Sequence, residues 1–437
     1  MKSLPTLRPG EGRAALLAAL GFFFALFGYS ILRPIRDAAG LQGGTSALPW
    51  LFTATLAATL VVSLLVAELS RHVARRKYVI AVLAVVTIGL IVFAPLLRDE
   101  TAIHAARAFY IWVSVVNLLI VSTWFSFLAD VFHKEQALRL YGLIGVGGTL
   151  GALLGAMTTG WLQPLGVHNL LFVSAALFAA AVPCAWHMPS AVSAGPAHTE
   201  PAGGLSPAWR GLALLPQRTV LLGICLYTFF HTFGGTFLYF LQAEIVAEHA
   251  ADRAARTAIF ATIDSWTQGV TLVLQVFITA RWTRLVGPTG ALLAQPLAVV
   301  MAGAGVWWAL SSQSASSLAS SLQMGLALPV VAMIIAQVVV RAVHFASARP
   351  VREALYVPLP SEEKYKAKAA IDTFVYRAGD ALGARLFDGY LKAVFGLSGV
   401  ALWLIPLGVA WCGVAVWLGK SASNTSDSPP RPDHPQH

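Results

Sequence analysis

Ionisable side chains are scarce in this sequence, and several of them lie at the end of, or inside, apolar runs. Only 11% of the 437 residues are charged, while 57% are hydrophobic. The Arg and Asp residues in such positions are Arg33, Arg36, Asp37, Arg377, Asp380, Arg385 and Asp388. Charges in an apolar medium are costly unless they face a cavity or each other. Because guanidinium groups suit phosphates and carboxylates, the arginines predict recognition of an anion.

Two interpretations of Arg33 and Arg36 remain open. They could bind an anion in a cavity, or they could anchor a helix end at the membrane interface and pair with Asp37. Two arginines and an aspartate around Pro34 are more than anchoring requires. The cavity role is therefore favoured.

The later group of charges lies on one face of a predicted helix. At about 100° per residue, Arg377, Asp380, Arg385 and Asp388 fall within an arc of about 140°. The spacing of i,i+3 predicts two ion pairs, Arg377–Asp380 and Arg385–Asp388. They could be structural pairs that join helices, or gating pairs that break and reform during transport.

Further polar groups lie inside apolar runs. Asp264, near Gln268 and Gln275, is a candidate proton or ion relay, although a solvated or paired carboxylate is slightly favoured. His231 and His344 could titrate near neutrality, or they could serve only as hydrogen-bonding groups in helix packing. The polar groups expected to bind an anion together with Arg33 and Arg36 are Asn117, His231, Gln337 and Arg341.

Apolar runs of about 20 residues, long enough to cross a bilayer, dominate the chain. Mean hydropathy is +0.70. The runs lie at about 14–33, 46–67, 78–97, 106–128, 141–163, 168–187, 218–241, 256–280, 289–309, 326–346, 369–394 and 398–419. We expect an all-α membrane protein with about twelve transmembrane helices.

The net charge of +10 follows the positive-inside rule rather than indicating nucleic acid. With both termini cytoplasmic, most Lys and Arg residues fall on the inner side, as expected of a multi-pass protein of a bacterial inner membrane. The three cysteines are scattered, and no residue spacing matches a metal site, a hydrolase triad or a kinase. We therefore expect no enzyme activity, no cofactor and no metal.

The chain divides at a polar segment. Residues 188–217 are rich in Pro, Gly, Ala and Ser, which is typical of a linker. We predict a six-helix half at 1–187, a cytoplasmic linker at 188–217, a second six-helix half at 218–420 and a disordered cytoplasmic tail at 421–437.

Glycines recur every four residues in the fifth run, at positions 147, 151 and 155. Such a stripe permits close approach of a neighbouring helix. It could form a rocking interface between the halves, but ordinary tight packing is favoured.

The distribution of polar residues resembles that of the major facilitator superfamily. In that fold the first, fourth, seventh and tenth helices line a central cavity, while the third, sixth, ninth and twelfth face lipid. Here the first group carries the polar residues, and the second group lacks Asp, Glu, Lys and Arg in its cores.

Two segments resemble the ATP:ADP antiporter family. One is Tyr29–Asp37, at the end of the first run. The other begins at Glu353 and continues through the charged segment before the eleventh run. The residues of this cytoplasmic motif are Glu353, Tyr356, Pro358, Lys364, Lys366, Lys368 and Asp372.

The resemblance implies exchange of a nucleotide or another organic anion by alternating access, without hydrolysis. It implies that Arg33, Arg36 and Arg341 contact phosphate and that Arg377 lies beside a gate. A rival hypothesis is a proton-coupled exporter of amphipathic or cationic compounds that uses Asp264. Another is a non-transporting sensor or assembly protein that docks partners on residues 349–368.

Overall fold

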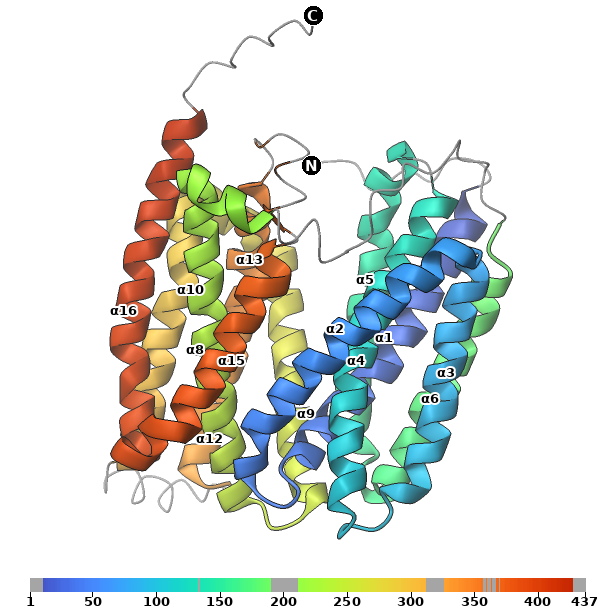
Figure 1. Cartoon of the computed structure of the whole chain (residues 1–437), viewed down its shortest axis with the longest axis horizontal. Helices are drawn as coiled ribbons and strands as arrows, with labels where there is room; N and C mark the ends of the chain where they lie inside the picture. Colours follow the sequence, from blue (N-terminus) through green and yellow to red (C-terminus); the bar gives the residue numbers. More distant parts are fainter. Residues whose placement is uncertain are drawn as a thin grey trace, which may run out of the picture. The chain divides into compact units, whose positions relative to one another are not determined.

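The protein is helical throughout the part described by a computed structural model (Figure 1). This part comprises residues 11–132, 134–189, 211–311, 326–356, 359, 363, 367, 368 and 370–426. Its α-helices are α1 (Gly12–Gly40), α2 (Leu48–His72), α3 (Arg75–Leu96), α4 (Ile103–Val131), α5 (Lys134–Trp161), α6 (Val167–Trp186), α8 (Thr219–His249), α9 (Arg253–Val273), α10 (Thr279–Ser311), α12 (Leu328–Val343), α13 (Arg349–Ala354), α15 (Tyr376–Leu386) and α16 (Lys392–Ser426).

Short 3₁₀ and π turns join or interrupt these helices. The 3₁₀ turns are η1 (Thr45–Ala47), η2 (Gln163–Leu165) and η3 (Leu215–Gln217). The π turns are η4 (Leu274–Ile278), η5 (His344–Ala348), η6 (Ile371–Val375) and η7 (Phe387–Leu391). The eleventh predicted run thus alternates between π and α geometry.

Two glycines divide helices that are otherwise continuous. Gly287 within α10 has φ of +69°, and Gly396 within α16 has φ of +66°. A residue with a Cβ rarely adopts this backbone conformation. The chain therefore turns at these points, and each of the twelve predicted runs is represented by a helix. The predicted all-α fold is confirmed.

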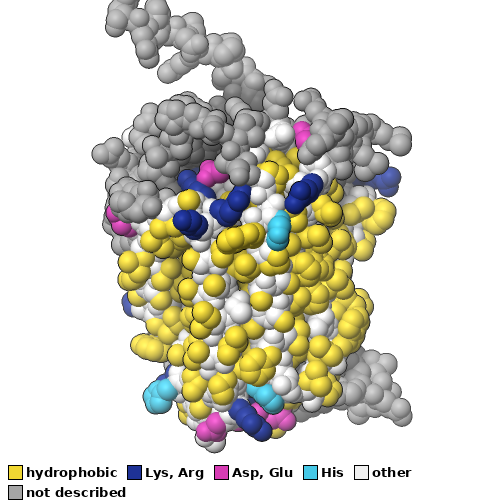
Figure 2. Space-filling view, turned by 90° about the vertical axis from the view of Figure 1, so that its right-hand side faces the viewer, with side chains coloured by type: hydrophobic (Ala, Val, Ile, Leu, Met, Phe, Trp, Pro, Cys, Tyr) yellow, Lys and Arg dark blue, Asp and Glu magenta, His cyan; other side chains and the backbone are white. Residues whose placement is uncertain are grey.

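Ten helical stretches in the described part are long and apolar enough to cross a membrane. The stretch from α9 through η4 is not among them, because it carries more polar residues. Figure 2 shows hydrophobic side chains forming a band across one face, with most charged and His side chains above and below it. This distribution is what a bilayer requires of a spanning bundle.

The chain forms two compact units, which are described separately. Unit 1 contains α1 to α6 together with Gln242–Gly269, which holds the end of α8 and most of α9. Unit 2 contains Leu205–Leu241 and Val270–His437. The helix pair α8–α9 therefore contributes to both units.

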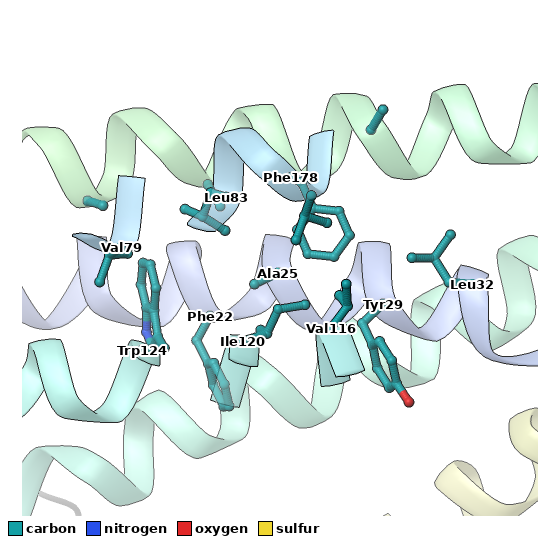
Figure 3. Close-up of a cluster of buried hydrophobic side chains, with 14 of the residues drawn as sticks. Phe22, Ala25, Tyr29, Leu32, Val79, Leu83, Val116, Ile120, Trp124 and Phe178 are labelled. Atoms are coloured by element: carbon teal, nitrogen blue, oxygen red, sulfur yellow. The ribbon is translucent and has the colours of Figure 1, made fainter. Parts of the chain in front are cut away.

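The core of unit 1 surrounds α1 (Figure 3). Phe22, Ala25 and Leu32 of α1 belong to one cluster with side chains from neighbouring helices, among them Trp124 of α4 and Phe178 of α6. Phe178, Ala25 and Leu32 are completely buried. This packing fixes the position of α1, the helix that carries Arg33 and Arg36.

The glycine stripe of α5 faces α1 within unit 1. A Cβ on Gly147, Gly151 or Gly155 would lie 2.7, 2.3 or 2.5 Å from the carbonyl oxygen of Ala19, Phe23 or Phe27, respectively. The stripe thus packs two helices of the same unit, as favoured from the sequence, and the alternative of an interface between the halves is wrong.

Two predicted boundaries are wrong. The first run was expected to end at residue 33, but α1 continues through Pro34 to Gly40. Arg36 and Asp37 therefore lie inside a helix. At the other terminus, α16 extends to Ser426, beyond the predicted start of the tail. Residues 190–210 of the predicted linker and 427–437 of the tail lie outside the described residues.

Candidate functional site

Arg36 and Asp37 form a close ion pair on α1. Arg36 Nη2 lies 2.6 Å from Asp37 Oδ1, and Nε donates to the same oxygen at 3.0 Å. The Arg36 guanidinium also lies over the Tyr110 ring of α4, 5.5 Å from its centroid. Asp37 is buried, with 6% of its surface exposed. The pair and the ring fix the orientation of the guanidinium.

Arg33, one helical turn before Arg36, pairs with Asp264 of α9. The distance from Arg33 Nε to Asp264 Oδ2 is 3.5 Å, and the two side chains are 29% and 7% exposed. Asp264 is thus a paired carboxylate, one of the two alternatives left open by the sequence. A guanidinium presents five N–H donors in total, so its pairing with one carboxylate oxygen does not use its whole binding capacity.

Replacing Asp264 by asparagine tests whether it pairs or relays protons. We expect the free energy of unfolding to fall by about 2 kcal/mol, because the partly buried Arg33 loses its counter-charge. Thermal unfolding of the purified protein measures this loss. The same change at exposed Glu248 of α8, Glu248→Gln, is the control. Unchanged stability with transport no longer driven by a proton gradient would instead support the relay.

Two arginines of α9 bind backbone carbonyls at helix ends of unit 1. Arg253 donates to the oxygen of Leu97, next to the end of α3, at 2.6 Å, and to Gln42 Oε1 at 2.5 Å. Arg256 donates to the oxygen of Leu41, which follows α1, at 3.2 Å. Cations are stabilised at helix C-termini. These contacts explain why Gln242–Gly269 packs within unit 1.

Arg253 and Arg256 were not among the predicted site residues. The sequence signal available was the pair of arginines in the first turn of a helix. Arg253 is only 6% exposed, and its burial depends on the neighbouring helix ends, which the sequence does not identify.

Outside the membrane, after α3, the hydroxyl and amide of Thr101 donate hydrogen bonds to Asp99 and lower the pKa of its carboxyl group.

Unit 1 also has a pocket of about 490 Å³. Glu244, Glu248 and Arg256 line it together with the backbone around Gly43 and Gly44. A pocket lined by two carboxylates and one guanidinium does not suit an anion.

The predicted site residue Asn117 of α4 is exposed, and no described residue forms a hydrogen bond with its side chain.

Polar side chains of α8, α10 and η5 meet in unit 2. Gln295 of α10 is almost fully buried, with 1% of its surface exposed. Its Nε2 lies 2.7 Å from His231 Nδ1, and its Oε1 lies 3.2 Å from His344 Nδ1. The two imidazole rings stack at 4.1 Å with an interplanar angle of 4°. Thus His231 belongs to a hydrogen-bonded trio with two residues distant in sequence.

The other predicted residues of the tenth run differ in their contacts. Gln337 is buried and donates to the backbone oxygen of Leu238 at 3.1 Å. It joins α12 to α8, so the predicted role of its amide in binding substrate receives no geometric support. Arg341, one turn later on α12, is half-buried.

Of the two predicted pairs on the eleventh run, one forms. Arg377 Nη1 lies 3.6 Å from Asp380 Oδ2, and Asp380 also accepts a hydrogen bond from the hydroxyl of Thr236 on α8 at 3.1 Å. The predicted Arg385–Asp388 pair is not formed here, since no ion pair joins these two side chains in the described structure. The π turn η7 begins at Phe387, and its i→i+5 hydrogen bonds alter the angular spacing on which the i,i+3 prediction depended.

Glu353 is the centre of the charged motif before η6. It accepts from Arg352 Nη2 at 3.2 Å and from Lys368 Nζ at 2.5 Å. Arg352, which is 8% exposed, also donates to Thr228 of α8 at 3.3 Å. Among the motif residues, Tyr356 is buried and Asp372 is exposed. Pro358, Lys364 and Lys366 lie outside the described residues.

Through its pair with Lys368, Glu353 connects the end of α13 to the chain just before η6. Arg352 was missed as a site residue, although its place in a charge cluster was visible in the sequence. A second ion pair, Arg218 Nε to Glu363 Oε2 at 2.6 Å, joins the start of α8 to the same segment. Within unit 2, the first pair thus joins Glu353 to Lys368 inside the segment, and the second joins the segment to the residue before α8.

The sequence matches a known family over part of its length. The family model "TLC ATP/ADP transporter" matches residues 249–423. The ADP,ATP carrier protein 1 of Chlamydia muridarum is 24% identical over 478 residues, covering 94% of this chain and 88% of that protein. The carrier of the same name from Chlamydia pneumoniae is 22% identical, covering 93% and 90%. The resemblance to the ATP:ADP antiporters is confirmed.

Solved structures of transporters share the fold. A mutant of the nucleoside transporter NupG superposes with a TM-score of 0.58 at 12% identity, covering 94% of this chain and 99% of that one. A D-xylose–proton symporter gives 0.60 at 13% identity, covering 93% and 96%. The major facilitator fold is thus confirmed. This multi-pass membrane protein is thus similar in sequence to carriers and in fold to solved transporters.

Proposed function

We propose that the protein exchanges nucleotides, ATP for ADP, across a bacterial inner membrane, with both termini in the cytoplasm. The curated relatives are named ADP,ATP carriers and cover nearly the whole chain. The observation that carries the proposal is the arrangement of Arg33 and Arg36 on successive turns of α1, each oriented by a carboxylate. Two oriented guanidinium groups match the several oxygens of a polyphosphate.

Arginines of unit 2 also take part in the proposed recognition of the nucleotide. Within unit 2, Arg341 lies on α12 and Arg377 lies on α15, where it is oriented by Asp380. In this proposal Arg33, Arg36 and Arg341 bind phosphate, and the Arg377–Asp380 pair contributes to a gate. The two six-helix halves, residues 1–187 and 218–420, would alternate in exposing the site to each side.

The rival of proton-coupled export through Asp264 has less support. A coupling carboxylate must release its partner and bind a proton in each cycle, whereas Asp264 is held by Arg33 at 3.5 Å and is only 7% exposed in its side chain. For the sensor hypothesis, the docking segment would be residues 349–368. One ion pair, Glu353–Lys368, joins the two ends of this segment to each other, and another, Arg218–Glu363, joins it to the residue before α8, which favours a structural role for it.

The proposal is tested with purified protein in liposomes. Labelled ATP or ADP is added outside, and the vesicles contain either unlabelled nucleotide or buffer. We expect uptake only into vesicles that hold nucleotide, because exchange needs a counter-substrate. Uptake of equal rate into empty vesicles would reject exchange, and the absence of uptake in both would reject the nucleotide as substrate.

A further inference from the structure

Tyr29 of α1 is a buried tyrosine whose hydroxyl group forms no hydrogen bond with any residue that the structure describes. Only 8% of its surface is exposed, and it belongs to the apolar cluster around α1. Figure 3 shows its hydroxyl oxygen at the edge of this cluster, pointing away from the labelled side chains. A phenylalanine would fill the same space without the free-energy cost of burying an unpaired hydroxyl. The hydroxyl is therefore more than packing requires.

The spacing on α1 places this tyrosine beside the two arginines of the proposed phosphate site. Arg33 and Arg36 follow Tyr29 by four and seven residues, so at about 100° per residue the three side chains lie within an arc of about 60°. Because long helical side chains point back toward the N-terminus, the two guanidinium groups extend toward the turn that carries Tyr29. The charged groups close enough to interact electrostatically with the hydroxyl are Arg36, Arg33, Asp37 and Asp264.

The hydroxyl can bind an anion without breaking an ion pair. Arg33 and Arg36 each pair with a carboxylate, at 3.5 and 2.6 Å. A phosphate that binds to them competes with Asp264 and Asp37 for their N–H groups. The O–H of Tyr29 is a donor for which no described side chain competes, and phosphate oxygens are strong acceptors. The three groups together therefore offer a phosphate two charged donors and one neutral donor.

We propose that the hydroxyl of Tyr29 donates a hydrogen bond to a phosphate oxygen of the nucleotide bound at Arg33 and Arg36. The inference rests on the proposed function for the identity of the anion. It adds a substrate-binding residue on the side of the arginines that is nearer the middle of α1. Because the surrounding side chains hold the ring in place, the donor is positioned before the ligand arrives, and its binding costs little conformational entropy.

Replacing Tyr29 by phenylalanine removes the hydroxyl oxygen and leaves the ring. We expect the dissociation constants of ATP and ADP, measured by calorimetry on the purified protein, to rise about 10-fold or more, as for loss of a hydrogen bond to a charged group. The temperature of unfolding without nucleotide is expected to stay the same or to rise, since the hydroxyl has no partner to lose in the described structure. A fall in this temperature would indicate a structural bond and overturn the inference.

Inorganic tripolyphosphate separates the phosphate chain from the nucleoside part of the ligand. It is titrated in the same way into wild type and Tyr29→Phe. We expect its dissociation constant to rise by about the same factor as that of ATP, because both ligands present phosphate oxygens to the hydroxyl. Weakening confined to the nucleotides would place the hydroxyl at the base or the ribose and overturn the inference.

The control is Tyr78→Phe, the same change at a buried tyrosine of α3 that is 5% exposed. Wild-type dissociation constants are expected in this variant. Equal ATP affinity in wild type and Tyr29→Phe overturns the inference while leaving nucleotide binding established. If wild type binds tripolyphosphate but neither nucleotide, the proposed function fails, and the comparison with tripolyphosphate alone decides the inference. If wild type binds none of the three ligands, both fail.

Discussion

Replacing Arg36 by alanine is expected to reduce nucleotide exchange by about 100-fold or more. The variant loses a guanidinium that is oriented by Asp37 at 2.6 Å and lies over the ring of Tyr110. Hydrogen bonds to charged groups contribute about 1.5–3 kcal/mol each, and a phosphate would lose up to two of them. Initial rates of exchange in liposomes, as a function of ATP concentration, measure the loss.

Two further variants separate binding from folding. Arg36→Ala leaves Asp37 buried without its counter-charge, which by itself lowers stability. The double change Arg36→Ala with Asp37→Ala removes both charges, and we expect it to recover stability but not exchange. Arg98→Ala, at an exposed arginine after α3, is the matched control. Normal exchange by the folded double variant would exclude Arg36 from phosphate binding.

Replacing Gly151 by alanine is expected to lower the free energy of unfolding by about 3 kcal/mol, a large effect for one methyl group. The new Cβ would lie 2.3 Å from the carbonyl oxygen of Phe23 and 3.1 Å from the backbone nitrogen of Phe27. Both are backbone atoms of α1, so the two helices must separate. The temperature of unfolding in detergent measures the loss.

The same substitution six residues earlier should have the opposite sign. A Cβ on Gly145 would meet no atom within 4 Å. Alanine is preferred over glycine inside a helix by about 1 kcal/mol, so Gly145→Ala is expected to be stabilising or neutral. Equal effects at both positions would show that α1 and α5 do not approach as closely as the structure indicates.

Helix pairing illustrates how far sequence reasoning extends. Glycines at every fourth position predicted a close helix contact, because that spacing places them on one face of any α-helix. Their partner, α1, could not be identified from the sequence, since many apolar helices offer a suitable surface.

The ion pairs predicted on the eleventh run depended on the local backbone geometry instead. The assumption of regular α geometry succeeded for Arg377–Asp380 and failed for Arg385–Asp388, where a π turn intervenes.

The sequence by itself determined the membrane-spanning helices, the fold class and the resemblance to the ATP:ADP antiporters, because these follow from local composition and short motifs. It also identified Arg33, Arg36 and Asp264 as costly charges that need partners. Only the tertiary structure decided that Asp264 pairs with Arg33, and that Gln295 joins His231 to His344. Such partners lie far apart in the chain, and which of them meet is set by the packing of whole helices, which no local pattern encodes.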